Sequence, residues 1–121
     1  MARILVVEDE ELVRRMMLAA LKQRGHQVEV CPDGEAGLRK LREQPFDVLI
    51  TDYRMPKMTG LELIQATAGL GVPTILMSSN TLEEMKIDAK DLAGVEYLRK
   101  PFGLTDLHAA IARARIQNPE S

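Results

Sequence analysis

The sequence predicts an α/β domain built as a doubly wound, five-stranded parallel sheet, a (βα)5 arrangement. Short apolar runs alternate with longer segments whose apolar residues recur at the helical period. Right-handed crossovers between parallel strands place the helices on both faces of the sheet. The length of 121 residues and the 45% hydrophobic content suit one domain with its own core.

The first predicted strand is buried on both faces, and the second, which follows the first helix, has one exposed face. Residues 3–7 (RILVV) form an apolar run typical of a strand buried on both faces. The next segment is predicted to be helical and to end at Gly25. Its apolar stripe consists of Val13, Met16, Met17, Ala20 and Leu21. Residues 27–31 (QVEVC) alternate between polar and apolar side chains, as expected of an edge strand with one exposed face.

The middle of the chain supplies the second helix and the third strand. A turn at 32–34 (PDG) leads into a predicted helix over 35–44. Gly37 lies inside this helix, where glycine costs about 1 kcal/mol relative to alanine. Residues 46–51 (FDVLIT) are predicted to form a buried strand.

The last three helices and two strands follow in the same alternation. A helix is predicted from 61 to about 68, closed by GLGVP, and a strand at 74–78 (TILMS). A more polar helix is expected from 81 to about 91, followed by a strand at 95–100 (VEYLRK). Thr105 can cap the last helix. Four methionines of the predicted helices and strands are expected to fill the core, namely Met16, Met17, Met77 and Met85.

Charge and composition argue against several classes of function. The 16 basic and 18 acidic residues give a net charge of −2, which offers no general attraction to nucleic acid or anionic lipid. The single cysteine, Cys31, cannot form an internal disulfide, and the apolar runs are too short to cross a membrane. The start is unlike a signal peptide. We therefore expect a cytoplasmic domain.

Polar and charged side chains follow four of the five predicted strands. They are Glu8 and Asp9 after the first strand, Asp52 after the third, Ser78 and Ser79 after the fourth, and Lys100 after the fifth. The carboxyl ends of parallel strands meet at one edge of the sheet, and ligands bind there beside the point where strand order reverses. We therefore expect these six side chains to share one site.

Three neighbouring carboxylates need a cation. Two like charges about 4 Å apart repel by roughly 4 kcal/mol at an effective dielectric of 20. Oxygen ligands without cysteine or histidine favour Mg²⁺, with Mn²⁺ as an alternative. Because Lys100 is a natural partner for phosphate, the predicted site is equipped to form an aspartyl phosphate on Asp52.

Four segments together resemble the receiver domain of bacterial two-component response regulators, the chemotaxis-regulator-like fold. They are LVVEDE (5–10), DVLITDYRMPKMTG (47–60), PTILMSS (73–79) and YLRKPF (97–102). The resemblance covers essentially the whole chain and implies the flavodoxin-like strand order 2-1-3-4-5. We expect the receiver domain to occupy residues 1–117 and the polar residues 118–121 to be a frayed tail or the start of a linker.

The resemblance also implies a role for each matched site residue. Asp52 would accept a phosphoryl group from the phosphohistidine of a sensor histidine kinase or phosphotransfer protein, or from a small acyl phosphate. Asp9, Asp52 and the backbone carbonyl of Arg54 would ligate Mg²⁺, with Glu8 acting through water. Lys100 would contact the phosphoryl group.

Four further positions would carry the switch and its timing. Ser78 would be the switch hydroxyl, and Tyr97 the aromatic ring that moves into the space that Ser78 vacates. Serine stands at 78 where threonine is common, which keeps the hydroxyl and loses a methyl group. Arg54 and Asn80 would tune the phosphoryl lifetime, and the Lys100–Pro101 peptide bond is expected to be cis.

The implied output is a change in the face made by the fourth helix, the fifth strand and the fifth helix. Its mixed charge would suit a homodimer, a downstream partner or an effector domain. The charged residues are Glu96, Arg99, Arg113 and Arg115. We expect no membrane contact and no direct nucleic acid binding by this domain, and a self-modifying switch rather than a turnover enzyme.

Simpler interpretations stay open for some residues. Ser79 is equally well explained as a helix-capping hydroxyl. Tyr97 suits a half-buried strand position in any fold. His26 and His108 are expected at the surface, away from the strand-end edge.

Three other functions compete with the phosphorylated switch. An aspartate phosphatase needs a second aspartate two residues after the nucleophile, and Arg54 stands there. A flavodoxin-like cofactor binder needs a hydroxyl- and glycine-rich phosphate loop after the first strand, where this chain has EDEE. A scaffold receiver that never becomes phosphorylated is not distinguished by sequence.

Overall fold

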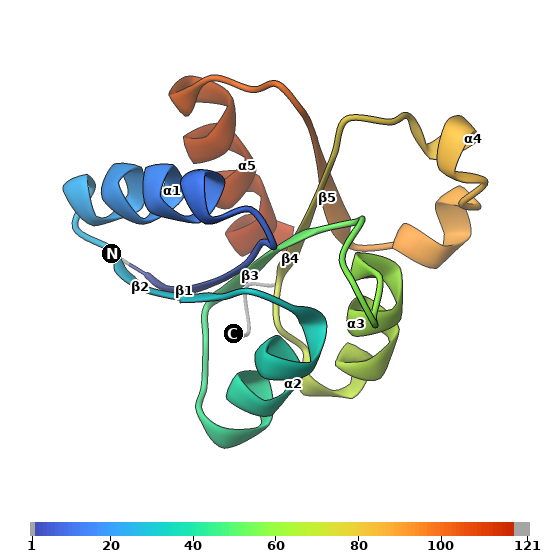
Figure 1. Ribbon diagram of the computed structural model, residues 1–121, viewed down its shortest axis with the longest axis horizontal. Coiled ribbons are helices and arrows are strands. Elements are labelled where there is room, and N and C mark those ends of the chain that lie inside the picture. The colour runs from blue at the N-terminus through green and yellow to red at the C-terminus, as the bar shows by residue number, and fades with distance from the viewer. Residues whose placement is uncertain (1, 118–121) are drawn as a thin grey trace.

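The computed structural model describes residues 2–117 and contains a five-stranded parallel sheet in the order β2-β1-β3-β4-β5 (Figure 1). The predicted fold class and strand order are therefore confirmed. The strands are β1 (Arg3–Val7), β2 (Gln27–Cys31), β3 (Val48–Asp52), β4 (Thr74–Ser78) and β5 (Val95–Arg99). The predicted tail at 118–121 lies outside the described residues.

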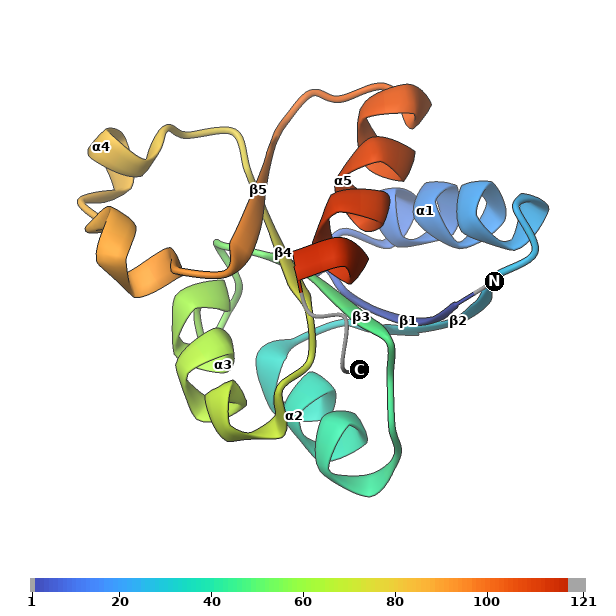
Figure 2. The ribbon, with the colours of Figure 1, turned by 180° about the vertical axis from the view of Figure 1, so that it is seen from behind.

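Helices cover both faces of the sheet. The helices are α1 (Glu11–Gln23), α2 (Gly34–Glu43), α3 (Gly60–Ala66), α4 (Leu82–Met85) and α5 (Leu104–Gln117), with 3₁₀ turns η1 (Ala68–Leu70) and η2 (Ala89–Leu92). Helices α1 and α5 lie together on one side, as Figure 2 shows from behind, and α2 and α3 lie on the other. None of the described helices is both long enough and apolar enough to cross a membrane.

The alternating side chains of β1 contribute to two separate cores. Ile4 and Val6 pack with residues of α1 and α5, whereas Leu5 and Val7 pack with residues of α2 and α3. All four side chains are fully buried. Burial on both faces explains why residues 3–7 read as a continuous apolar run rather than an alternating one.

The predicted helix from 81 to about 91 is wrong in its extent. A capping box between Thr81 and Glu84 starts α4, but the helix ends at Met85. Lys86 then adopts a left-handed conformation with φ of 57°. The turn at Lys86 lets Ile87 and Leu92 reach a core cluster against β4, in which both are buried. Burial of these two side chains competes successfully with continuation of the helix.

Smaller differences occur at three other positions. The third strand begins at Val48 and includes Asp52, so the carboxylate is the last residue of the strand itself. Helix α5 begins at Leu104, and the amide of Gly103 donates to the Asp106 carboxylate at 3.1 Å, so Thr105 is not its cap. Met16 is 61% exposed rather than core, because it lines an open surface hollow with Pro101 and Phe102.

Gly37 sits where α2 approaches β1 most closely. A Cβ atom at this position would lie 2.7 Å from Cγ2 of Val7. This distance is shorter than a van der Waals contact, and valine is stiff at χ1. The propensity cost expected from the sequence is therefore opposed by a packing requirement that only glycine meets without rearrangement.

Candidate acidic metal site

The carboxyl ends of β1, β3 and β5 bring three charged side chains into direct contact. Nζ of Lys100 lies 2.7 Å from Oε1 of Glu8 and 3.1 Å from Oδ1 of Asp52. The strand register explains the meeting, since Val7 pairs with Thr51, and Asp52 pairs with Met77 on β4. The predicted gathering of these residues at one edge is confirmed.

Asp9 completes an acidic group suited to a cation. Carboxylate oxygens of Glu8, Asp9 and Asp52 all lie within 4.8 Å of one another. Glu8 and Asp52 are buried, whereas Asp9 is exposed. Hard oxygen donors with one solvent-facing member fit Mg²⁺, which binds through one or two carboxylates and keeps several waters.

The charges in this site are balanced unevenly. Burial, followed by the charge of Glu8, raises the pKa of Asp52 to about 7, although Lys100 acts in the opposite direction. Burial and the neighbouring Glu8 also raise the pKa of Asp9. Burial alone would raise the pKa of Glu8, but hydrogen bonds from Lys100 and from the amide of Glu10 lower it overall. Lys100 thus pairs most closely with Glu8 and more weakly with Asp52, and the three carboxylates together favour an added cation.

A hollow of about 350 Å³ opens over these carboxylates. Its lining comes from four strand ends and their loops, and includes Asp9, Asp52, Arg54, Ser78, Ser79 and Lys100. This volume accommodates a phosphoryl group beside a partly hydrated cation. Glu10 also lines the hollow, which adds to its acidic rim.

The loop after β4 links the hollow to β5. The hydroxyl of Ser78 accepts a hydrogen bond from the amide of Asn80 at 3.0 Å, and Ser78 is buried. The Tyr97 hydroxyl donates to the backbone carbonyls of Ser78, at 3.4 Å, and of Asn80. Nε of Arg54 donates to Oδ1 of Asn80 at 3.4 Å. The predicted switch and tuning residues are therefore joined through Asn80.

The loop after β5 carries the predicted cis peptide. The Lys100–Pro101 bond is cis, which confirms the expectation from the sequence. The amide of Lys100 donates to the carbonyl of Ser78 at 2.8 Å.

Gly60 is a site residue that sequence reasoning missed. A Cβ atom at Gly60 would lie 2.3 Å from the backbone oxygen of Asp52. The amide of Gly60 also donates to the carbonyl of Tyr53 at 2.8 Å. The chain after Asp52 therefore folds back until the start of α3 touches the strand tip, and the signal for this was the glycine that ends DYRMPKMTG.

Arg14 is a second residue that was missed. Its Nη1 donates to the backbone carbonyl of Glu8 at 2.8 Å. The amide of Glu10 donates to Oε2 of Glu8 at 3.1 Å. The available signal was an arginine one turn into the helix that follows the acidic run EDEE.

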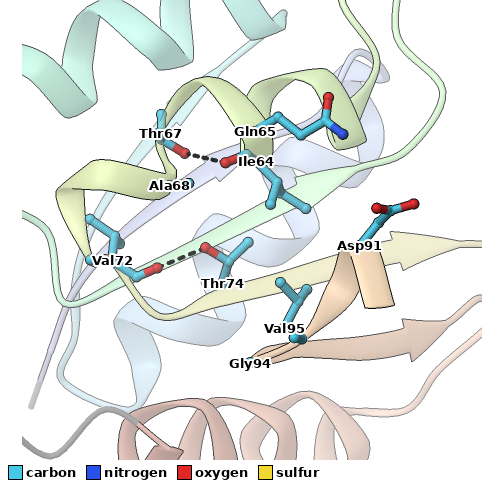
Figure 3. A pocket seen from close by; sticks show the side chains of 11 residues that line it. Ile64, Gln65, Thr67, Ala68, Val72, Thr74, Asp91, Gly94 and Val95 are labelled. Carbon is cyan, nitrogen blue, oxygen red and sulfur yellow. Dashed lines mark hydrogen bonds between the residues drawn. The ribbon is translucent and has the colours of Figure 1, made fainter. Parts of the chain in front are cut away.

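A second cavity lies at the opposite end of the sheet and carries different chemistry. It has a volume of about 230 Å³ and lies between α3 with η1 and the start of β5 (Figure 3). The hydroxyls of Thr67 and Thr74 already donate to the carbonyls of Ile64 and Val72 (Figure 3). Asp91 is the acidic side chain in its lining, so the clustered carboxylates belong to the hollow at the carboxyl ends.

A doubly wound parallel sheet with an acidic hollow and a lysine at its carboxyl edge defines an α/β domain that handles phosphate with a divalent cation. The chain matches the model of the response regulator receiver domain over residues 4–112. It therefore belongs to the response regulator receiver domain family, a family of phosphoacceptor switches in two-component signalling.

Known proteins resemble the chain in sequence and in structure. It is 34% identical to the transcriptional regulatory protein KdpE of Mycobacterium tuberculosis over 119 residues, which cover 98% of this chain and 53% of KdpE. The chemotaxis protein CheY4 of Vibrio cholerae superimposes with a TM-score of 0.84 and 30% identity, over 94% of this chain and 98% of that chain. The chain thus spans about half the length of KdpE.

A second similar structure contains a metal. The receiver domain of the sensor histidine kinase PA1611 from Pseudomonas aeruginosa was solved with a magnesium ion coordinated in its active site cleft. It superimposes with a TM-score of 0.83 and 28% identity, over 94% of this chain and 97% of that chain. The donor set of Glu8, Asp9 and Asp52 fits the same cation.

Proposed function

We propose that this chain is a phosphorylation-dependent signalling switch with Asp52 as its phosphoacceptor. The phosphoryl group would come from the phosphohistidine of a sensor histidine kinase or phosphotransfer protein, or from a small acyl phosphate. The observation that carries this proposal is the position of Lys100 Nζ, 3.1 Å from Oδ1 of Asp52, inside the acidic hollow. The residues 1–117 are taken as the receiver unit.

Phosphoryl transfer requires Asp52 as nucleophile. A carboxylate oxygen of Asp52 attacks phosphorus, the phosphorus–nitrogen bond of the donor breaks, and its electron pair leaves with the imidazole nitrogen. Lys100 contacts the phosphoryl oxygens as a point charge. Mg²⁺, or Mn²⁺ in its place, would be held by Asp9, Asp52 and the Arg54 carbonyl, with Glu8 through water, and would neutralise charge on the transferred group.

The response to phosphorylation would begin at Ser78. Its hydroxyl would leave the Asn80 amide for a phosphoryl oxygen, and the Tyr97 ring, now bonded to the same loop, would follow. Arg54 lines the hollow and donates to Asn80, and this hydrogen bond would affect how readily water reaches the phosphoryl group. This placement supports their proposed role in phosphoryl lifetime.

The output surface would comprise α4, β5 and α5. Because α4 has only four residues, β5 and α5 supply most of this surface, including the ion pair between Glu96 and Arg113. We place a homodimer or an effector contact here, and no direct contact with nucleic acid or membrane. Sedimentation of the protein with and without a phosphate mimic would detect the dimer. We infer a cytoplasmic location from the same two-component chemistry.

An apolar hollow beside the acidic site is a suitable contact for the phosphoryl donor. It has a volume of about 390 Å³ and is lined by Val13, Met16, Ser79, Lys100, Pro101 and Phe102. Val13 and Met16 belong to α1, and Leu12 on that helix is 71% exposed. Apolar side chains next to the acidic site would contact the donor protein while Asp52 reaches its phosphohistidine.

Beryllofluoride, which mimics a phosphoryl group on aspartate, tests the acceptor directly. We expect the wild-type protein to bind it in the presence of Mg²⁺ and the Asp52→Asn variant to lose binding, because the variant has no carboxylate to coordinate beryllium. Tyrosine fluorescence reports the event, since the chain has two tyrosines and no tryptophan. Tyr53 follows the acceptor directly.

Acetyl phosphate provides the covalent counterpart. Intact-mass measurement should show one added phosphoryl group on the wild type and none on Asp52→Asn. Absence of both beryllofluoride binding and phosphorylation in the wild type would contradict the proposal and favour a scaffold receiver. Sustained hydrolysis of a phosphoester would instead favour an aspartate phosphatase, although Arg54 replaces the acid such enzymes use.

A further inference from the structure

The loop between β1 and α1 contains an unusual concentration of negative charge. Four consecutive acidic residues, 8–11, begin at the end of the buried strand β1. Two of them, Glu8 and Asp9, line the acidic site with Asp52. Because like charges at this spacing repel, some group must hold the backbone of this loop against opening.

A side-chain hydrogen bond from the N-cap residue often fixes the loop before a helix, but α1 has none among the residues that the structure describes. Glu10 is the N-cap of α1, yet its side chain makes no capping hydrogen bond. The loop is held instead by the Glu8 amide, which donates to the Cys31 carbonyl at 3.0 Å, and by the Glu10 amide, which donates to the Glu8 carboxylate. Neither bond fixes the peptide that leads into Asp9.

Arg14 contacts that peptide. Nη1 of Arg14 donates to the Glu8 carbonyl oxygen at 2.8 Å, a short distance for a hydrogen bond from a charged donor. The Glu8 carboxylate is meanwhile held by Lys100 at 2.7 Å. The side chain of Glu8 is therefore bound by Lys100 and its backbone carbonyl by Arg14, two cations that lie far apart in the sequence.

We propose that Arg14 is a positioning residue for the metal site. Its guanidinium holds the Glu8–Asp9 peptide so that the Asp9 carboxylate stays turned toward Asp52, and its charge offsets the acidic loop. The expected effect on metal binding rests on the proposed function. The hydrogen bond by which Arg14 fixes the loop is a property of the metal-free protein. Outer partners that orient metal ligands commonly change metal affinity by 10–100-fold when removed.

The next residue on α1 provides a matched control. Arg15 is the same residue type and has the same charge, but it pairs with Glu11 at 3.2 Å on the surface, with 75% of its side chain exposed. Substituting either arginine by glutamine removes one positive charge near the acidic loop. Only Arg14→Gln also removes the hydrogen bond to the Glu8 carbonyl.

The experiment compares wild type, Arg14→Gln, Arg14→Lys and Arg15→Gln by titration with MgCl₂, followed through the amide signals of residues 8–10 and 52–54. We expect Arg14→Gln to weaken Mg²⁺ binding roughly tenfold and Arg15→Gln by less than about twofold. Arg14→Lys should recover part of the loss, because an ammonium group can donate one hydrogen bond to the carbonyl. Thermal unfolding of each variant shows whether the domain remains folded.

A metal-free measurement separates this inference from the proposed function. Without Mg²⁺, the amides of Asp9 and Glu10 should exchange with solvent faster in Arg14→Gln than in wild type or Arg15→Gln. Equal exchange in all four proteins, or equal loss of Mg²⁺ affinity in Arg14→Gln and Arg15→Gln, would overturn the role of Arg14. If the wild type bound no Mg²⁺ while the exchange difference persisted, the proposed function would fail and the hold on the loop would stand.

Discussion

Lys100 and Gly60 determine the local geometry of the acidic site at the scale of single residues. Lys100 lies between two buried carboxylates, and its short hydrogen bond to Glu8 compensates for taking that charge out of water. Gly60 acts through space rather than charge, because the start of α3 approaches the backbone oxygen of Asp52 too closely for any side chain. One residue balances the charge of the site, and the other permits its shape.

Substitution of Gly60 by alanine tests the second effect. We expect Gly60→Ala to lower the free energy of unfolding by about 1–3 kcal/mol, since the added methyl group must displace either α3 or the tip of β3. Beryllofluoride binding should weaken as well, because the tip of β3 carries Asp52. Urea unfolding measures the change in the free energy of unfolding. Gly69→Ala is the control, because a Cβ at Gly69 meets nothing within 4 Å, and a similar loss there would contradict the steric explanation.

At the scale of elements, close contacts with the sheet override local helix preference in two places. Helix α4 stops at Met85 because Ile87 and Leu92 are drawn into the core beside β4. Helix α2 tolerates Gly37 in its interior because the helix lies against Val7 of β1. In both cases burial of apolar surface outweighs a backbone preference of about 1 kcal/mol or less per residue.

The α2–β1 contact predicts a reversal of the usual alanine effect. Gly37→Ala should destabilise the domain by about 1 kcal/mol or more, although alanine is the better helix former, because its methyl group would overlap Val7. In a Val7→Ala background the same substitution should become neutral or stabilising. A double-mutant cycle from urea unfolding measures this coupling, and additive effects would contradict it.

At the scale of the whole molecule, two separate groups of charges lie on the sheet. The carboxyl ends of β1, β3 and β5 assemble the acidic site, while a surface network of ion pairs links β1, β2 and α2. Glu29 on β2 accepts from Lys40 of α2 at 2.7 Å and from Arg3 of β1 at 3.2 Å. The hydrogen bond from Lys40 is the main reason that the pKa of Glu29 lies below its usual value.

This network predicts a defined pH dependence of stability. A lowered pKa means that Glu29 contributes stability above its ordinary value of 4.5, and that the contribution disappears as pH falls through the folded-state pKa. Glu29→Gln should therefore be less stable than wild type at pH 7, by less than about 1 kcal/mol because all three side chains of the network are partly exposed to solvent. The two unfolding curves should converge below pH 4.5, and a constant gap down to pH 3 would refute this assignment.

Sequence patterns predicted most of the fold because they record local periodicity and burial. The continuous apolar run at 3–7 and the alternating run at 27–31 matched a central and an edge strand. The charged residues after the strands predicted the acidic edge, since parallel strands place their carboxyl ends together. The roles of individual site residues, by contrast, came from family resemblance and remain proposals.

The sequence by itself determined the alternation of strands and helices, and the chemistry at the strand ends, because both depend on residues close together in the chain. The tertiary structure alone decided the end of α4, the exposure of Met16, the need for glycine at 37 and 60, and the contact of Arg14 with Glu8. Each of these depends on a distance across the folded core or across a loop, which periodicity along the chain does not encode.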